Sequence, residues 1–364
     1  MKKIYFMIAL SAAVLSAASC TKEQYDAPDK DKYVYDIPQT YLDEDAVLGC
    51  YYVNYSTAVS SSTSPEVPLL GYYKTSDTGV LEQHIEWADS AGVDFFIFGW
   101  NNASSDRDLV DSFIDARSEE SGVRFAFCYN TSHLKVTNDS PLESENNYRK
   151  FIAEFVDVLA GYMLDESYYR IDGKPVLLVT PANLSSDALL SIDFKKVIGQ
   201  LRDDFKSFYG LDLYVVGQIT TGWVAPVNYA DHQIYSFDAV VANTWKTRSY
   251  DLFYSYFSFL DINWNNWKTT LAKRDVEFVP CIYPSFNDRV YDNKSYYYTF
   301  GDNGELDDYV DFCNVAKRNA GSHNLVFINS WNDWKYGTNL EPSDLKEGRF
   351  LDETRAQFKI HEQQ

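Results

Sequence analysis

Short apolar runs that alternate with stretches of helical periodicity constrain this 364-residue chain more than any other feature. Each run has the length of a buried strand, and the stretch after it places apolar residues three and four positions apart. Strands that alternate with helices form a parallel sheet, because each helix carries the chain back to the same edge. The predicted strands are 46–53, 93–100, 123–129, 176–179, 213–217, 237–245, 276–283 and 325–328.

Eight such repeats in one chain predict an α/β fold, a single (β/α)8 TIM barrel. A doubly wound open sheet is the alternative. The first helix shows the pattern well, because Leu81, Ile85 and Ala88 share one face and Gly92 ends it. The predicted helices are 78–91, 105–120, 148–163, 191–208, 250–273 and 305–319.

The first twenty residues read as a targeting segment. Lys2 and Lys3 precede an apolar stretch that is too short to span a bilayer comfortably. Residues 17–20, Ala-Ala-Ser-Cys, resemble a bacterial lipobox, which predicts lipidation at Cys20. We therefore expect a lipoprotein signal peptide over 1–20, a tether over 21–40 and the barrel domain over 41–364. The expected location is the cell envelope, anchored by lipid to the outer membrane, either facing the surface or in the periplasm.

Charge and cysteine spacing argue against several classes of partner. The formal net charge of −21 makes nucleic acid a poor partner. The first strand–helix turn lacks a GxGxxG pattern and no GxxxxGK[ST] occurs, so phosphate cradles have no support. Cysteine and histidine spacing fits no metal site, and buried free thiols are the simpler interpretation. We expect no metal and no cofactor, and membrane contact only through the lipid anchor.

The predicted strands end in residues that suit a carbohydrate site. Active sites of (β/α)8 barrels lie at the carboxyl ends of the strands, where these side chains would converge on one rim. Aromatic faces offer flat apolar surface to sugar rings, although aromatic residues are also commonly buried as plain packing. The residues at these ends are Trp100, Asn101, Tyr129, Gln218, Trp245 and Tyr283.

The last predicted strand leads into the most polar and aromatic of these endings. Trp331, Asn332, Asp333 and Trp334 follow the apolar run directly. A carboxylate can supply acid, base or charge stabilisation, and the indoles can carry pyranose rings. The alternative is a turn whose tryptophans fill the rim of the core.

With these stretches the chain resembles the glycoside hydrolase family 99-like group, which includes the WbsX-type proteins of polysaccharide gene clusters. The resemblance covers nearly the whole chain after the tether. It implies a (β/α)8 barrel without metal and internal, retaining cleavage of α-mannosides. It also implies one carboxylate that assists the sugar 2-hydroxyl and another that protonates the leaving oxygen. The stretches that carry it are 71–73, 84–98, 169–175, 331–342 and 348–351.

The sequence departs from the motif of that group at both carboxylates. The motif reads Asn-Glu-Trp-x-Glu-Gly, and in this chain Asp333 stands for the first glutamate and Tyr336 for the second. A tyrosine, with an ordinary pKa of about 10, is a poor general acid near neutral pH. Asp288 or Glu341 could substitute in space, although Glu341 before a proline also suits a structural role at a turn.

Two functions of different classes follow. The first is a glycoside hydrolase acting on an α-mannoside-type or related polysaccharide, with Asp333 as base or charge stabiliser and Tyr336 or an unassigned carboxylate as proton donor. The second is a catalytically inactive glycan-binding protein on the same barrel. A structural lipoprotein without ligand is a third possibility. The predicted substrate-binding residues are Trp100, Asn101, Tyr129, Trp245, Tyr283, Trp331, Asn332, Trp334 and Glu341.

Overall fold

A computed structural model describes residues 35–134, 139–142, 144–180, 194–219, 234–242, 256–287, 290, 299–301 and 304–360. The chain divides into two compact units, Met1–Asp36 and Ile37–Gln364, and all helices and strands of the described residues belong to the second. Cys20, Trp245 and Asp288 lie outside the described residues, as does the predicted signal peptide.

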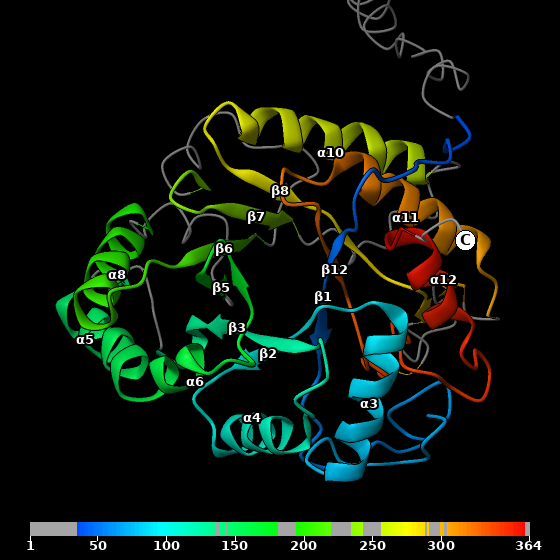
Figure 1. The fold of residues 1–364 in the computed structure, drawn as a ribbon, viewed down its shortest axis with the longest axis horizontal. Coiled ribbons are helices and arrows are strands. Elements are labelled where there is room, and N and C mark those ends of the chain that lie inside the picture. Colours follow the sequence, from blue (N-terminus) through cyan, green and yellow to red (C-terminus); the bar gives the residue numbers. More distant parts are fainter. Residues whose placement is uncertain are drawn as a thin grey trace, which may run out of the picture. The chain divides into compact units, whose positions relative to one another are not determined.

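The second unit is a parallel barrel surrounded by helices (Figure 1). Its sheet runs in the order β8-β7-β6-β5-β3-β2-β1-β12-β9, and each neighbouring pair is parallel. The predicted barrel is therefore confirmed. The strands are β1 (Val47–Tyr52), β2 (Phe95–Trp100), β3 (Arg124–Asn130), β5 (Lys174–Thr180), β6 (Tyr214–Ile219), β7 (Ala239–Ala242), β8 (Glu277–Val279), β9 (Cys281–Ile282) and β12 (Leu325–Ile328).

The barrel closes through the strand that contains Pro280. β8 pairs with β7 on one side, β9 pairs with β12 on the other, and only Pro280 separates β8 from β9. Proline has no N–H to donate to a ladder, so the strand is interrupted there. The Pro280 carbonyl still accepts a hydrogen bond from the Phe327 N–H at 2.9 Å. β8 and β9 together thus form one interrupted strand, which completes the eight-stranded barrel.

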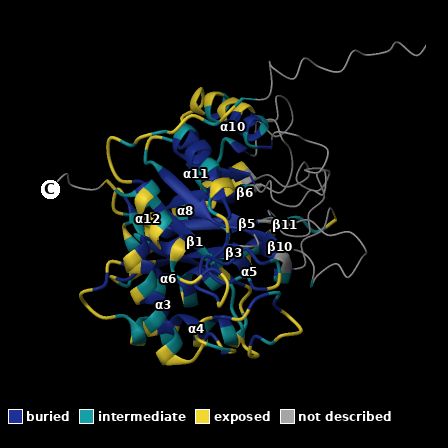
Figure 2. Cartoon of the chain, turned by 90° about the vertical axis from the view of Figure 1, so that its right-hand side faces the viewer, coloured by how far each residue is buried: buried dark blue, intermediate teal, exposed yellow. Residues whose placement is uncertain are grey.

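Helices cover the outer face of the strands, and their buried sides face the barrel (Figure 2). The predicted helix over 148–163 is divided, because a π-helical turn at Phe155–Leu159 separates two α-helical parts. A helix near the C-terminus was not predicted from the sequence. The helices are α3 (Thr78–Ala91), α4 (Ser104–Ala116), α5 (Glu145–Glu154), α6 (Ala160–Leu164), α8 (Phe194–Tyr209), α10 (Tyr256–Ala272), α11 (Asp307–Asn319) and α12 (Arg349–Phe358).

Aromatic rings fill the lower interior of the barrel, and a glycine makes room for them. A Cβ atom at Gly49 in β1 would lie 2.5 Å from the ring of Phe95 and 2.9 Å from that of Phe327. Phe95 also stacks on Tyr169 with ring centroids 4.1 Å apart. Tyr169 precedes β4 (Arg170–Ile171), a short strand that pairs antiparallel with the start of β5. Side chains therefore fill the barrel interior toward the amino ends of the strands. We expect a ligand to bind at the rim formed by the carboxyl ends of the strands.

The four cysteines of the barrel are free and buried, as expected. They are Cys50, Cys128, Cys281 and Cys313. Within the described ranges, no helix is both long and apolar enough to cross a bilayer.

Candidate functional site

Residues 329–342, which we call the closing loop, follow β12 at the carboxyl ends of the strands. The Leu340 N–H donates to the Ser330 carbonyl at 2.9 Å, so the loop turns back on itself. The Trp331 N–H donates to the carbonyl of Tyr51 in β1 at 2.7 Å. The peptide bond between Asn329 and Ser330 is cis. The backbone alone therefore ties this loop to the neighbouring strand.

A buried polar cluster lies under the loop and is centred on Glu341. Its carboxylate accepts a hydrogen bond from the Tyr73 hydroxyl at 2.5 Å and lies 3.1 Å from Nε2 of His84. Tyr73 in turn accepts from the indole N–H of Trp334 at 3.0 Å. Burial, and then the charge of Glu341, raise the pKa of Tyr73, so its hydroxyl stays protonated and can donate. The Glu341 side chain is fully buried, which gives it a supporting position and not an exposed one.

A buried ion pair between Lys346 and Glu66 holds the loop from another side. The ammonium group of Lys346 lies 3.0 Å from Oε1 of Glu66, and their side chains are only 1% and 4% exposed. The same ammonium donates to Ser285 Oγ at 2.5 Å and to Asn339 Oδ1 at 3.1 Å. Lys346 therefore joins the β1–α3 loop, the segment after β9 and the closing loop.

Asp333 is half-buried at the turn of the closing loop. Its N–H donates to Ser330 Oγ at 2.6 Å, and the Trp334 N–H donates to the hydroxyl of Tyr55 at 3.2 Å. Burial raises the pKa of Tyr55 first, and the negative charge of Asp333 raises that pKa further. Asp333 thus occupies the first carboxylate position of the motif, with partial access to solvent.

Tyr336 is also half-buried, and its ring stacks on Phe286 with centroids 6.3 Å apart. The Asn287 N–H donates to the Tyr336 carbonyl at 2.7 Å. Gly337 follows with φ of +59°, and a Cβ there would lie 3.1 Å from that of Asn287. Only glycine accepts both this conformation and this approach without strain. Tyr336 is therefore held beside Phe286 by its backbone as well as by its ring.

Three residues of the loop that were predicted at the site, Trp331, Asn332 and Trp334, are fully buried. Trp331 packs edge-on against Phe96, with ring centroids 5.1 Å apart, and against His84 at 5.6 Å. The Asn332 amide pairs with the backbone of Val53 through bonds of 2.7 Å and 3.1 Å. Trp331 and Trp334 have no exposed surface in this structure, so their faces serve packing.

Trp100 and Tyr129 point away from the barrel interior. Trp100 has no exposed surface and packs on Phe127 at 5.0 Å, with the guanidinium of Arg107 over its ring. The Tyr129 hydroxyl donates to Glu154 on α5 at 2.8 Å. Side chains alternate between the two faces of a strand, and these two have the parity that faces the helices.

The remaining predicted residues differ in exposure. Asn101 is exposed beyond the end of β2, and its side-chain oxygen accepts from the Asn130 amide at 2.8 Å. Tyr283 is 1% exposed and packs on Phe312 of α11 with centroids 4.8 Å apart. Trp245 lies among the residues that are not described.

Four side chains that face the barrel interior meet just below the strand ends. The Tyr51 hydroxyl of β1 donates to Oε1 of Gln218 in β6 at 3.2 Å, although these strands are not neighbours in the sheet. The Thr180 hydroxyl donates to the same oxygen at 3.0 Å, and Cys128 Sγ lies 3.4 Å from it. We call Tyr51, Cys128, Thr180 and Gln218 the barrel floor. Of these, the sequence pointed only to Gln218. The alternation of side chains along a strand places Cys128 on the face opposite to Tyr129, but it does not indicate which of the two faces is inward.

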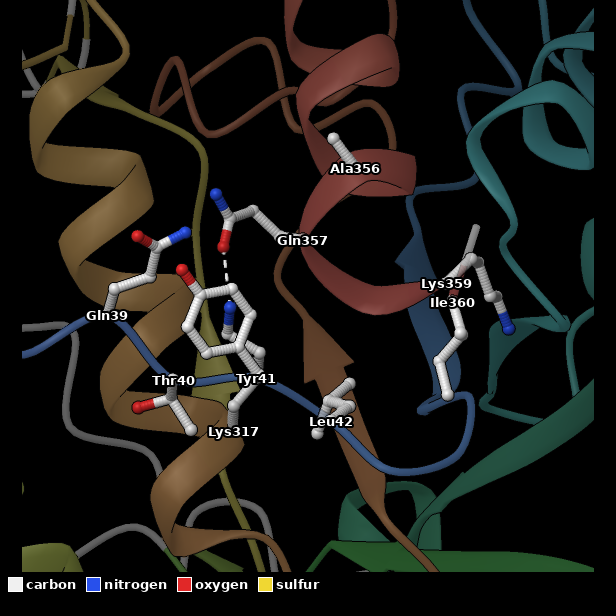
Figure 3. Close-up of a pocket in the computed structure, with 9 residues that line it drawn as sticks. All are labelled: Gln39, Thr40, Tyr41, Leu42, Lys317, Ala356, Gln357, Lys359 and Ile360. Carbon is white, nitrogen blue, oxygen red and sulfur yellow. Dashed lines mark hydrogen bonds between the residues drawn. The ribbon is translucent and has the colours of Figure 1, made fainter. Parts of the chain in front are cut away.

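Two cavities in the described part of the chain lie elsewhere. One, of about 270 Å³, lies between residues 39–42 and helices α11 and α12, where Lys317 donates to Gln357 at 2.6 Å (Figure 3). The other, of about 510 Å³, lies beside the start of β8 and includes Glu277 and Lys268. Neither contains a predicted site residue. Among the residues described, no cluster of three or more His, Cys, Asp or Glu side chains could hold a metal ion.

Comparison with known proteins supports the family relationship that the sequence motifs suggested. The family described as "Glycosyltransferase WbsX" matches residues 58–354. A solved "glycoside hydrolase-like protein" is 25% identical, with a TM-score of 0.79 over 91% of this chain and 99% of that one. No curated protein matches this chain.

Two more distant structures share the fold alone. The GH99 endo-alpha-mannosidase from Bacteroides thetaiotaomicron is 17% identical, with a TM-score of 0.60 over 86% of this chain and 97% of its own. The catalytic domain of the Bacillus sp. JAMB-750 GH26 endo-beta-1,4-mannanase is 9% identical, with a TM-score of 0.53 over 87% of each. The chain thus belongs to the WbsX glycosyltransferase family and has a glycoside hydrolase-like fold related to GH99 endo-α-mannosidases.

Proposed function

We propose that this protein is a glycoside hydrolase that acts on an α-mannoside-type or related polysaccharide. The observation that carries the proposal is the position of Asp333: a half-buried aspartate on the closing loop, which follows the carboxyl end of the last barrel strand. Two buried polar clusters, around Glu341 and Lys346, support the loop that presents it. A loop fixed in this way can hold a reacting group in one geometry, which is what catalysis by positioned side chains requires.

Asp333 would act as base or charge stabiliser at the sugar. A second residue must then donate the proton to the leaving oxygen. In two-carboxylate glycosidases the second acid protonates the leaving oxygen. Glu341, the other acidic residue of the closing loop, is fully buried and bonded to Tyr73, so it does not face a substrate. The candidates that remain are Tyr336, which stands at the donor position of the motif, and Asp288, which lies outside the described residues. The Tyr336 hydroxyl would serve as a weak acid or only as a hydrogen-bond donor.

Replacing Tyr336 by glutamate is expected to raise the rate of saccharide cleavage by up to about 10²-fold, because it restores a carboxylic acid at the donor position. The measurement is release of reducing ends from α-mannan and from a panel of other glycans. Tyr336→Gln is the matched control, since it has similar size to glutamate but cannot donate a proton as an acid. Equal rates for the two variants would show that position 336 does not supply the proton.

The family is described as a glycosyltransferase family, so glycosyl transfer is a reaction to be compared with hydrolysis. Transfer from a nucleotide sugar needs a site for phosphate, and the sequence shows neither a GxGxxG pattern after the first strand nor a GxxxxGK[ST] motif. Transfer of a cleaved sugar to a second saccharide needs no such site. Product analysis separates the two outcomes, since hydrolysis makes shorter saccharides only and transfer also makes longer ones.

The second candidate is a glycan-binding protein without turnover, and the tyrosine at position 336 favours it. Calorimetry with the same panel would then show binding, while no product forms even after long incubation. Turnover of any bound glycan would exclude this candidate. Loss of both binding and turnover across the panel would contradict the carbohydrate proposal as a whole.

We further propose that the protein is anchored by lipid at Cys20 to the cell envelope, on the basis of the lipobox-like sequence. Labelling of cells with a radioactive fatty acid should mark the protein, and Cys20→Ala should abolish the label and release the protein from the membrane fraction. A Cys20→Ala protein that keeps its label would contradict the assignment.

A further inference from the structure

The barrel floor carries no ionised group at neutral pH. Burial raises the pKa of Tyr51 well above its usual value, and burial raises the pKa of the Cys128 thiol to about 11. Thr180 and the Gln218 amide do not ionise. Binding a carboxylate or phosphate out of water is costly unless a cation or several donors offset its desolvation. The floor is therefore better suited to uncharged hydroxyl groups.

Gln218 has hydrogen-bond donors left over. Its side-chain oxygen already accepts from Tyr51 at 3.2 Å and from Thr180 at 3.0 Å, with Cys128 Sγ at 3.4 Å. Its amide nitrogen makes no hydrogen bond to the residues that the structure describes. The side chain is only half-buried, so the two N–H groups can donate to a molecule that enters from the strand ends.

Beside Cys128, whose thiol contacts Gln218, β2 has a glycine at its inward-facing position. Gly99 is the register partner of Cys128, so both face the barrel interior. Gly99 is exposed, and a Cβ built on it meets no atom of the described chain within 4 Å. Gly49, which lies lower in the barrel, is in contrast crowded by Phe95 and Phe327. Glycine in a strand often marks a place where a ligand or another segment of backbone approaches closely. At Gly99 no described protein atom makes such an approach.

We propose that the barrel floor and the space above Gly99 form the subsite for the innermost ring of an uncharged saccharide, with Gln218 Nε2 donating to a ring hydroxyl. The proposal rests on the carbohydrate function proposed above and adds which residues select the ring. Gln218 fixes the ring by a directed hydrogen bond, whereas Gly99 admits it by having no side chain. A sugar that carries a phosphate or carboxylate on this ring would meet no cation of the floor and would be rejected.

The hydrogen bond is tested with Gln218→Glu. This change keeps an acceptor oxygen for Tyr51 and Thr180 but replaces the N–H donor with a carboxyl oxygen. The floor stays bonded, while a ring hydroxyl that accepted from Gln218 loses its donor. We expect the dissociation constant for α-mannotriose, or for another neutral trisaccharide of the panel that the unmodified protein binds, to rise about two- to tenfold. Calorimetry provides the constant, and circular dichroism checks the fold.

The space is tested with Gly99→Leu. The side chain would fill the position where the ring is proposed to lie, and its Cβ meets no described protein atom that it could displace. Binding of the same trisaccharide should weaken about tenfold or more, with an unchanged melting temperature. Gly161→Leu is the matched control, because Gly161 is likewise exposed with nothing within 4 Å but lies in α6. It should bind as the unmodified protein does.

The outcomes separate this inference from the function on which it rests. If the unmodified protein binds no saccharide, both fail. If it binds neutral saccharides and the Gly99 and Gln218 variants bind equally well, only the subsite assignment fails. Tighter binding of a trisaccharide phosphorylated or oxidised to a uronic acid on its terminal ring would also overturn the assignment. Weakened binding in both variants, with Gly161→Leu unaffected, is the result that we expect.

Discussion

Asp333→Asn is expected to lower the rate of saccharide cleavage by about 10²- to 10⁴-fold while leaving the barrel folded. The amide has nearly the shape of the carboxylate but carries no charge and cannot accept a proton at neutral pH. The backbone bond from the Asp333 N–H to Ser330 Oγ does not involve the side chain and should persist. The measurement is the initial rate of reducing-end release at saturating α-mannan, or at the best substrate of the glycan panel.

The control for this variant is Asp352→Asn, which removes one negative charge from an exposed position on helix α12. It should cleave at the unmodified rate. Binding should be less affected than turnover in Asp333→Asn, because the group is proposed to act mainly in the transition state. An Asp333→Asn protein that cleaves as fast as the unmodified one would remove the closing loop from the mechanism.

Lys346→Met is expected to destabilise the barrel by about 3–5 kcal/mol, the range for removing one partner of a buried ion pair. Methionine keeps most of the side-chain volume but leaves the carboxylate of Glu66 buried without its cation. Ser285 and Asn339 lose the same partner. The free energy of unfolding from urea titration measures the loss. Lys150→Met, at an exposed site on α5, should change it by less than about 0.5 kcal/mol.

A double variant distinguishes a lost charge pair from lost packing. Adding Glu66→Gln to Lys346→Met removes the uncompensated carboxylate, so the double variant should be more stable than Lys346→Met alone. If the two losses simply add, the ion pair does not hold the loop. The comparison also tests the link to function, because a loosened closing loop should lower turnover in Lys346→Met even under conditions in which the barrel is folded.

The closing loop also shows where reasoning from sequence was incomplete. Six of its residues were expected at a sugar site, yet of these only Asp333 and Tyr336 are partly exposed. The structure buries Trp331, Asn332, Trp334 and Glu341. A loop sequence does not reveal which side chains point inward, because that depends on the strands and helices that meet it. Tyr73 and His84, which contact Glu341, come from segments far away along the chain.

The repeat of apolar runs and helical patterns was sufficient to predict the barrel, because periodicity is a local property that burial imposes on each segment separately. The order of the strands then followed from the connections. Only the tertiary structure decided which residues face the barrel interior. A shift of one position along a strand turns every side chain to the other face. Trp100 and Tyr129 therefore pack under helices, while Gly99 and Cys128, one residue earlier, face the site.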